Sequence, residues 1–241
     1  MKLNRLLFTA VVLSAVTVQS QTAKKKNQLE FSVGHNSGFL KNLEFAPVVM
    51  YEYQGPVFKL DYTRTSKNKN LFEVELDYLK AELKTDVSPS LNNEYMKAGM
   101  GFSYLKKIYR DERLAVNLGL QSQTTVAIYD NKNLTYNDGD YFTVHQEFGI
   151  AGKLSYQLNE KQYLTSKLFI PVVLFRVTSA AGKFYALDNY QSVLWDLEYG
   201  YKLSTHIDVK AKYNFNYSRL QVPAAYRELQ YQLNLGINYK F

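Results

Sequence analysis

Apolar and polar residues alternate along most of the chain after about residue 28. In the last run, residues 229–241, every odd position carries Leu, Tyr, Ile or Phe, and every even position is polar or glycine. Successive side chains of a β-strand point to opposite faces, so this period of two predicts a strand with one apolar face. The same alternation covers residues 72–78, 96–104, 114–120, 142–156, 195–203 and 207–217.

The length of these runs indicates which solvent meets the apolar face. Several of them extend over roughly 12 to 18 residues, whereas strands of soluble sandwiches usually have about five or six. A tilted strand needs roughly 9 to 11 residues to cross a bilayer, so these runs can span a membrane and continue beyond it. The sequence therefore predicts an all-β fold, a closed antiparallel transmembrane β-barrel. Aromatic residues near the run ends, where membrane barrels carry interfacial girdles, are Tyr104, Tyr156, Tyr201, Tyr217 and Tyr239.

The first residues predict export. Lys2 and Arg5 form a charged start, residues 6–18 an apolar stretch, and Val18-Gln19-Ser20 a small-residue cleavage site, which is typical of a secretory signal peptide. We expect a signal peptide at residues 1–20, a short basic segment at 21–27 and one barrel domain at 28–241. An N-terminal membrane anchor would need a longer apolar stretch. The absence of cysteine excludes lipoprotein acylation, disulfides and thiolate metal sites.

The formal charge of +7 does not indicate a nucleic-acid partner. Lys2, Arg5 and Lys24–Lys26 lie in or beside the targeting segment, and without these five the chain has 24 basic against 22 acidic residues. Binding to nucleic-acid phosphates would call for positive charge clustered on one face. The mean hydropathy of −0.32 and a longest later apolar run of six residues, Ile170–Phe175, exclude transmembrane helices, which need about 18 consecutive apolar residues.

The ending Tyr-Gln-Leu-Asn-Leu-Gly-Ile-Asn-Tyr-Lys-Phe resembles that of the outer-membrane β-barrel proteins of Gram-negative bacteria. In that broad class, a last strand with alternating apolar residues and a C-terminal aromatic residue is recognised by the barrel-assembly machinery. The resemblance covers the architecture of residues 28–241 and points to no subfamily. It implies an outer-membrane location, contact with outer-membrane lipids and recognition by that machinery. The residues that match this assembly signal are Tyr231, Leu233, Leu235, Ile237, Tyr239 and Phe241.

The connection lengths predict the number of strands, because such barrels have short periplasmic turns, longer external loops and usually an even strand count. Eight strands are expected after residue 70, and another at residues 57–65. One more must come from residues 28–53, where the runs 29–33 and 43–53 are separated by the turn-like Asn36-Ser37-Gly38. Pro47 and Gly55-Pro56 make the second run the less regular one. We expect ten strands, and eight and twelve stay open. Short connections are expected at 66–69, 110–111, 159–160 and 204–205, and longer ones at 85–93, 129–139 and 177–188, with a brief one at 221–225.

The inward face of such a barrel should be crowded and charged. Eight strands enclose an interior that side chains just fill, so ten should still be narrow. Opposite charges buried there favour a structural ion-pair network, and a small pore or an ion or proton path is the functional alternative. The pair of inward-facing residues His145 and Glu147 lacks a third ligand, and we expect no metal and no cofactor. Candidates for the lumen network are Asp61, Glu73, Glu75, Asp77, Lys97, Glu147, Lys210 and Lys212.

His35 and Ser37 form the one motif with catalytic potential. On a strand they share a face with Leu29, Phe31 and Val33, which would be the lipid-facing one. A His-x-Ser pair on the outer wall resembles the outer-membrane phospholipase and lipid A deacylase barrels. That resemblance implies Ser37 as nucleophile and His35 as general base.

The chain departs from those families in three ways. They commonly have Asn after the Ser, where this chain has Gly38, and their motif lies deeper in the barrel. No third catalytic group is evident, and Asn42 and Glu44 are the conjectural candidates.

We therefore expect a small outer-membrane β-barrel with a structural role or a binding role through its external loops. Porin-like passive passage of small solutes is a variant of this expectation. Loops of about ten residues can still contact a protein partner, because loops often carry binding residues. The alternative is a lipid-ester hydrolase that uses Ser37 and His35.

Overall fold

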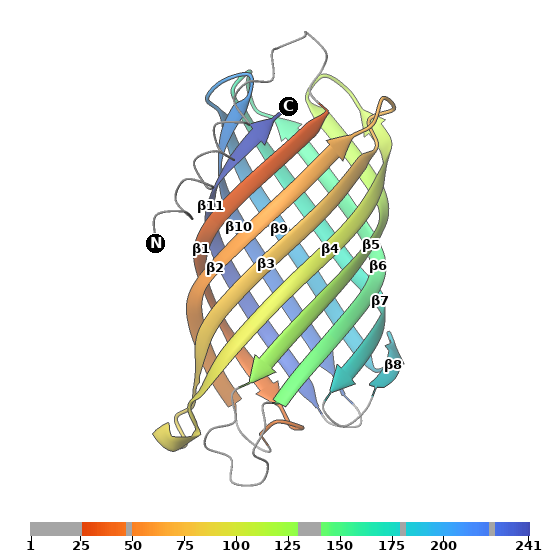
Figure 1. Cartoon of the computed structure of the whole chain (residues 1–241). Coiled ribbons are helices and arrows are strands. Elements are labelled where there is room, and N and C mark those ends of the chain that lie inside the picture. The colour runs from red at the N-terminus through yellow and green to blue at the C-terminus, as the bar shows by residue number, and fades with distance from the viewer. Residues whose placement is uncertain (1–25, 47–49, 130–140, 179–181, 222–224) are drawn as a thin grey trace, which may run out of the picture.

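The computed structural model describes residues 26–46, 50–129, 141–178, 182–221 and 225–241. Ten antiparallel strands of 13 to 18 residues form a closed barrel (Figure 1), which confirms the expected fold class and strand number. The expected signal peptide lies outside the described residues. The barrel strands are β1 Asn27–Asn42, β2 Met50–Thr65, β3 Leu71–Lys84, β4 Asn93–Arg110, β5 Leu114–Tyr129, β6 Tyr141–Gln157, β7 Gln162–Thr178, β9 Tyr190–Lys202, β10 Ile207–Leu220 and β11 Tyr226–Lys240.

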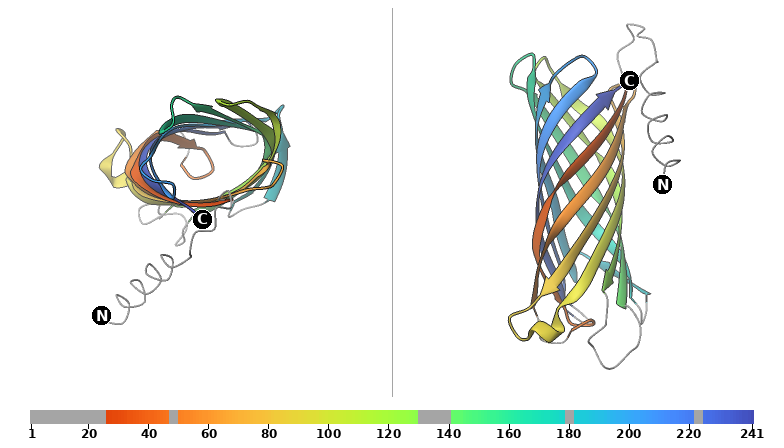
Figure 2. Two further views of the ribbon diagram at one scale, coloured as in Figure 1. Left: turned by 90° about the horizontal axis from the view of Figure 1, so that it is seen from above. Right: turned by 60° about the vertical axis from the view of Figure 1, so that its left-hand side comes forward.

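The first and last strands close the ring. β1 pairs with β11 in antiparallel register from Gln28↔Lys240 to Asn42↔Tyr226. Beyond this ladder, the N–H of Phe241 donates to the carbonyl of Asn27 at 3.0 Å, and the N–H of Asn27 donates back at 3.1 Å. Figure 2 shows the resulting ring along its axis. A short strand, β8 (Gly182–Ala186), pairs with the end of β7, and a 3₁₀ turn, η1 (Pro89–Leu91), lies between β3 and β4.

The connections differ between the two ends of the barrel. Short turns join β2 to β3, β4 to β5, β6 to β7 and β9 to β10, and they lie at the end where β11 finishes (Figure 1). In the turn after β4, Asp111 Oδ1 accepts from the N–H groups of Arg113 and Leu114 at 2.8 and 2.6 Å, which holds the pKa of its carboxyl below the usual range. Short turns face the periplasm in bacterial barrels, so the opposite end is extracellular.

The N-terminal hairpin differs from the sequence-based prediction. The segment Asn36-Ser37-Gly38 is not a turn but continues β1, which runs without a break to Asn42. The reversal comes at residues 43–46, so the expected run 43–53 is divided between this connection and β2. Gly55-Pro56 does not interrupt β2 either. Proline lacks an N–H, and the ladder to β3 skips these two residues while the ladder to β1 continues through them.

An apolar belt surrounds the barrel. On β11, Leu233, Leu235 and Ile237 are 61–67% exposed, whereas the intervening Asn234 and Asn238 are at most 3% exposed. The same alternation holds on the other strands, with apolar side chains outward and polar ones inward. In the described part of the chain, no helix is long and apolar enough to cross a membrane. An exposed apolar belt of this kind is the surface that a barrel presents to lipid.

The polarity reverses at the extracellular ends of the strands. On β3, Leu79, Ala81 and Leu83 point inward and are buried, whereas Lys80 and Lys84 point outward with side chains 55% and 57% exposed. An apolar interior beneath a charged exterior is the pattern of a protein in water, not in lipid. The barrel therefore extends beyond the membrane as a water-exposed rim with its own apolar core.

The belt predicts a large cost for a charge at its middle. Leu235→Arg should lower the free energy of unfolding by about 2–4 kcal/mol, because Arg at the bilayer midplane of a barrel costs that much. Val87→Arg is the control, since Val87 is 71% exposed in the connection after β3. Urea unfolding in lipid vesicles can be followed through Trp195, the single tryptophan. Equal effects of the two substitutions would contradict the assignment of the belt to lipid.

Candidate functional site

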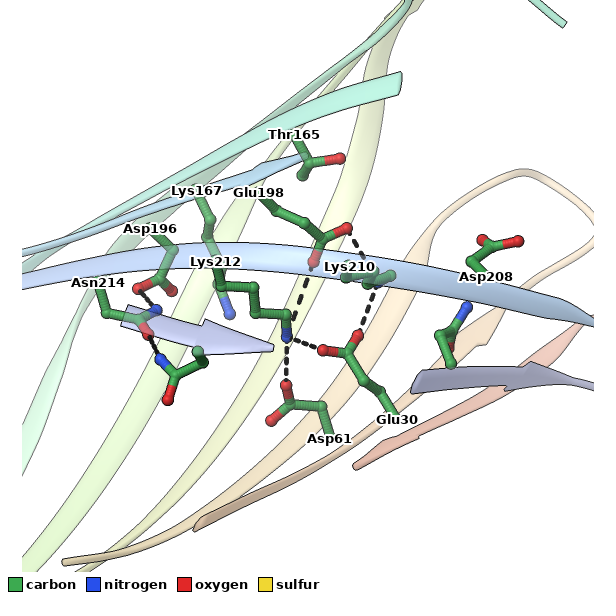
Figure 3. Close-up of polar contacts among 12 residues, drawn as sticks. Glu30, Asp61, Thr165, Lys167, Asp196, Glu198, Asp208, Lys210, Lys212 and Asn214 are labelled. Atoms are coloured by element: carbon green, nitrogen blue, oxygen red, sulfur yellow. Dashed lines mark hydrogen bonds and ion pairs between the residues drawn. The ribbon is translucent and has the colours of Figure 1, made fainter. Parts of the chain in front are cut away.

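Lys212 of β10 joins carboxylates from three other strands in the periplasmic half of the lumen (Figure 3). Its Nζ lies 2.7 Å from Asp61 Oδ2 of β2 and 3.7 Å from Glu198 Oε2 of β9. It also pairs with Glu30 of β1. Lys210, on the same strand, lies 2.7 Å from Glu30 and 2.9 Å from Glu198. This network joins strands on both sides of the seam between β1 and β11.

A second network joins strands that are far apart in the ring. Lys167 of β7 pairs with Glu73 of β3 at 3.0 Å and also with Glu75. Lys153 of β6 lies 2.5 Å from the other oxygen of Glu73, and the hydroxyl of Ser103 donates to Glu73 at 3.0 Å. Since β3 and β7 are separated by three strands in the sheet order, this network crosses the lumen.

Glu228 of β11 is the centre of a third network, in the extracellular half. Lys97 of β4 lies 2.8 and 2.9 Å from its two oxygens. The hydroxyl groups of Tyr53, Tyr226 and Tyr95 donate to it at 2.6, 2.8 and 3.4 Å. Gly38 makes room for this arrangement, because a Cβ at that position would lie 2.6 Å from the Tyr53 ring. Glycine is thus required by the close approach of Tyr53 and not by a turn.

A tyrosine cluster closes the extracellular end of the interior. We use this name for Tyr51, Tyr53, Tyr95, Tyr129, Tyr190 and Tyr226, each at most 4% exposed. Phe45, from the connection after β1, packs among them, with ring centroids 4.8 Å from Tyr129 and 5.9 Å from Tyr51. In the view along the axis this connection turns inward over the lumen (Figure 2).

Two polar contacts hold this connection in place. Arg176 of β7, whose side chain is 1% exposed, lies 3.4 Å from Glu44, and Tyr141 donates to the same carboxylate at 2.8 Å. The Nε of Arg176 donates to His145 at 3.1 Å, and its guanidinium lies 5.3 Å from the centroid of the Tyr226 ring. The first extracellular connection is thereby fixed to β6 and β7.

Small cavities lie in the middle of the lumen. Two cavities of about 80 Å³ each lie between the networks and share Lys59, Asp77 and Asp196 in their linings. A water molecule needs at least about 10–15 Å³ of such space, so each cavity has room for several waters. A larger vestibule of about 360 Å³ opens at the periplasmic mouth beside Arg110 and Lys240.

The structure places all eight lumen residues singled out from the sequence on the inner wall. Asp61, Lys210 and Lys212 belong to the first network, Glu73 and Glu75 to the second, and Lys97 to the third. Glu147 accepts a hydrogen bond from Tyr190. Asp77 lies against Gly99, where a Cβ would meet its carboxylate, and has no ion pair among the described residues.

Five buried charged residues of the interior were not singled out from the sequence. On β1, β10 and β11 the inward parity of the strand is the signal that could have identified them, whereas on β7 a bulge shifts that parity. Glu30 and Glu228 alternate with apolar neighbours on the two strands that close the barrel. The five residues are Glu30, Lys167, Arg176, Asp208 and Glu228.

The residues expected to form the assembly signal lie on the outer wall of β11 and just after it. Tyr231, Leu233, Leu235, Ile237 and Tyr239 share its outward parity. Phe241 is 47% exposed, and its ring stacks on Tyr239 with centroids 5.9 Å apart. Their recognition by the assembly machinery stays a prediction.

His35 and Ser37 are both exposed on the outer wall of β1. His35 lies opposite Leu233 and Pro56, and Ser37 opposite Tyr231 and Gln54. Among the described residues, no hydrogen bond joins the two side chains. Neither conjectural third group is beside them, because Asn42 points inward at 2% exposure and Glu44 binds Arg176 and Tyr141. No group of three or more His, Cys, Asp or Glu residues suited to a metal occurs in the described ranges.

The comparisons with known proteins identify the fold. No family model and no curated protein matches the chain. The structure is similar to the outer membrane protease OmpT from Escherichia coli, with a TM-score of 0.62 and 10% identity over 93% of this chain and 100% of OmpT. At this identity the likeness shows the fold alone. The translocator domain of the autotransporter NalP from Neisseria meningitidis also matches, with a TM-score of 0.48 and 10% identity over 99% of this chain and 96% of that domain.

The fold and the apolar belt together indicate in which membrane the protein is located. The resemblance to the broad class of Gram-negative outer-membrane barrels is confirmed, without a subfamily. The expected location in the outer membrane is likewise confirmed by the fold and by the exposed apolar residues around the barrel.

The network around Lys212 predicts that loss of a buried ion pair lowers the free energy of unfolding more than loss of an exposed one. Lys212→Met should lower the free energy of unfolding by about 3–5 kcal/mol, because it leaves buried carboxylates without their partner. Lys80→Met is the matched control and should cost about 1 kcal/mol or less, since the Lys80–Glu94 pair is about half exposed. Urea unfolding in vesicles measures both. A Lys212→Met barrel as stable as the Lys80→Met barrel would show that the network does not stabilise the fold.

Proposed function

We propose that this protein is a non-conducting outer-membrane barrel that anchors a rigid extracellular rim for binding to a partner outside the cell. The observation that carries the proposal is the reversed polarity of the strand ends, with Leu79, Ala81 and Leu83 inward and Lys80 and Lys84 outward. Polar groups at the mouth of a channel help to admit water and solutes, whereas an apolar constriction can exclude water. Here the mouth has an apolar core instead, like that of a soluble domain.

Side chains fill the lumen at two successive levels along the barrel axis, and this supports a closed lumen. The networks of Lys212 and Lys167 cross the periplasmic half, and Glu228 with the tyrosine cluster fills the extracellular half. The cavities between them are small, about 80 Å³ each, which supports a lumen filled mainly by side chains. The two levels act in series, so the loss of one leaves the other closed.

The rim is well suited to present a binding surface. The apolar core beneath it, together with the contacts of Glu44 to Arg176 and Tyr141, fixes the first connection on the barrel. Loops held on a rigid scaffold are where binding residues are most often found. Binding of a partner to the described part of the first connection, residues 43–46, would then cost little entropy of ordering.

The closed lumen predicts the electrical behaviour of the protein. Purified wild-type protein in a planar lipid bilayer should give no stable conductance steps. Tyr95→Ala with Tyr129→Ala, which opens the extracellular level, should also stay closed, because the Lys167 and Lys212 networks remain. A heat-dependent gel shift confirms that each variant is folded. Large and stable porin-like steps from the wild-type protein would overturn the proposal in favour of passive solute passage.

The alternative lipid-ester hydrolase has a direct test. A serine nucleophile needs a base within about 2.6–3.2 Å and a group that orients that base, and His35 has no such orienting partner among the described residues. We therefore expect no hydrolysis of phospholipid or lipid A esters above background, with or without calcium. Turnover that disappears in both Ser37→Ala and His35→Ala, while the barrel still folds, would instead establish the hydrolase.

A further inference from the structure

Three cations lie side by side on the outer wall of the barrel. Lys41 of β1 is directly opposite Arg227 of β11, and Arg227 is directly opposite Arg219 of β10. All three have the outward parity of their strands, because their neighbours Asn42, Glu228 and Leu220 are buried inside. We call these three residues the cationic row. Like charges directly opposite each other on neighbouring strands destabilise a sheet.

The cationic row has no acidic partner in the described part of the chain. The two connections that flank it, residues 43–49 and 221–225, contain one acid, Glu44, which binds Arg176 and Tyr141 instead. Glu52 and Asp188, on the flanking segments, form no ion pair with it. The other side of the rim is different: there Lys80 pairs with Glu94 at 3.4 Å, and Lys84 with Glu82 at 3.3 Å. An external anion would therefore relieve a repulsion that the protein itself leaves in place.

The position of the cationic row indicates where that anion comes from. Immediately below it on the same three strands lie Phe39, Leu229 and Tyr217. The next outward positions are Ser37, Tyr231 and Phe215, and Trp195 of the neighbouring β9 lies opposite Phe215. Aromatic belts of this kind lie at the level of the lipid headgroups. The row lies two residues, about 7 Å, beyond Phe39 and Tyr217, and four residues, about 13 Å, beyond Tyr231 and Phe215 along each strand. It therefore lies where the phosphates of outer-leaflet lipids are found.

We propose that the cationic row binds the phosphorylated headgroup of an outer-leaflet glycolipid. Side chains on three neighbouring strands span roughly 10 Å, since strands lie about 4.8 Å apart. This width suits a headgroup that carries two phosphates better than a single small anion. The guanidinium groups of Arg219 and Arg227 can each donate two hydrogen bonds to phosphate oxygens. The acyl chains of the same lipid would lie on Phe39 and Leu229.

The test uses lipid A as the probe. Wild-type barrel, extracted from vesicles of phosphatidylcholine with a small fraction of lipid A, should retain one lipid A molecule in native mass spectrometry. The variant with Lys41→Gln, Arg219→Gln and Arg227→Gln should bind it at least tenfold more weakly. The control, Lys80→Gln with Lys84→Gln, removes cations that already have acidic partners and should bind like the wild type. A gel shift verifies folding of every variant.

A second measurement separates binding from a structural effect. In phosphatidylcholine alone, Arg227→Gln should make the barrel more resistant to urea, because it removes the central charge of a repelling row. Added lipid A should stabilise the wild type and have little effect on this variant. Three results would each overturn the proposal: equal retention of lipid A by the wild type and the triple variant, equal retention of dephosphorylated lipid A, or equal retention of phosphatidylglycerol. Displacement of lipid A by millimolar inorganic phosphate would also overturn it, since it would show a site for free phosphate.

Discussion

In hydrocarbon, every backbone N–H and C=O group must find its partner within the protein, and the structure depends on this constraint. A sheet satisfies it only when its two edges meet, which here requires the pairing of β1 with β11. Closure then divides the side chains of every strand into one set that faces lipid and one that shares a narrow interior. Carboxylates and ammonium groups of the second set are buried by the closure itself. They must neutralise one another, as Glu30, Lys210 and Lys212 do at the seam.

The height of the barrel has a second consequence. Strands of up to 18 residues are longer than a bilayer requires, so part of each stands in water. In that part the outer face meets water and not lipid. It must therefore be charged or polar, and the inner face can form an apolar core. The tyrosine cluster and Phe45 form that core, and they close the lumen in the same place. The charged outer face and the buried apolar core are thus two results of one change of solvent along the strands.

Much of the fold could be predicted from the sequence because the period of two is a direct consequence of strand geometry. The outward Leu233, Leu235 and Ile237 follow from it. The boundaries of β1 could not, because Asn36 and Gly38 are turn residues by composition and only the neighbouring Tyr53 and Gln230 explain them: Gly38 gives space to Tyr53, and Asn36 accepts from Gln230 at 2.6 Å. Local propensity was overruled there by contacts with other strands.

Two further features could not be predicted from the local sequence. The apolar run Ile170–Phe175 obscures the alternation of β7, because a bulge opposite Phe148 and Gly149 shifts the parity within it. Most partners of Lys97, Lys167 and Lys212 come from strands that are not their neighbours in the sheet, so they follow only once the order and register of the sheet are known. The cationic row has the same origin, since Lys41 and Arg227 meet only because the chain closes on itself.

The sharing of Lys212 among three carboxylates also bears on how this protein can change over generations. A neutral residue at Lys212 would remove an ion-pair partner from Glu30, Asp61 and Glu198 on three separate strands, although Glu30 and Glu198 would keep Lys210. A second change that neutralised one carboxylate would restore the net charge of the network but not the lost contacts of the other two. This position should therefore drift slowly among descendants of the protein, whereas the lipid-facing residues beside it, such as Ala211 and Tyr213, can exchange freely for other apolar side chains.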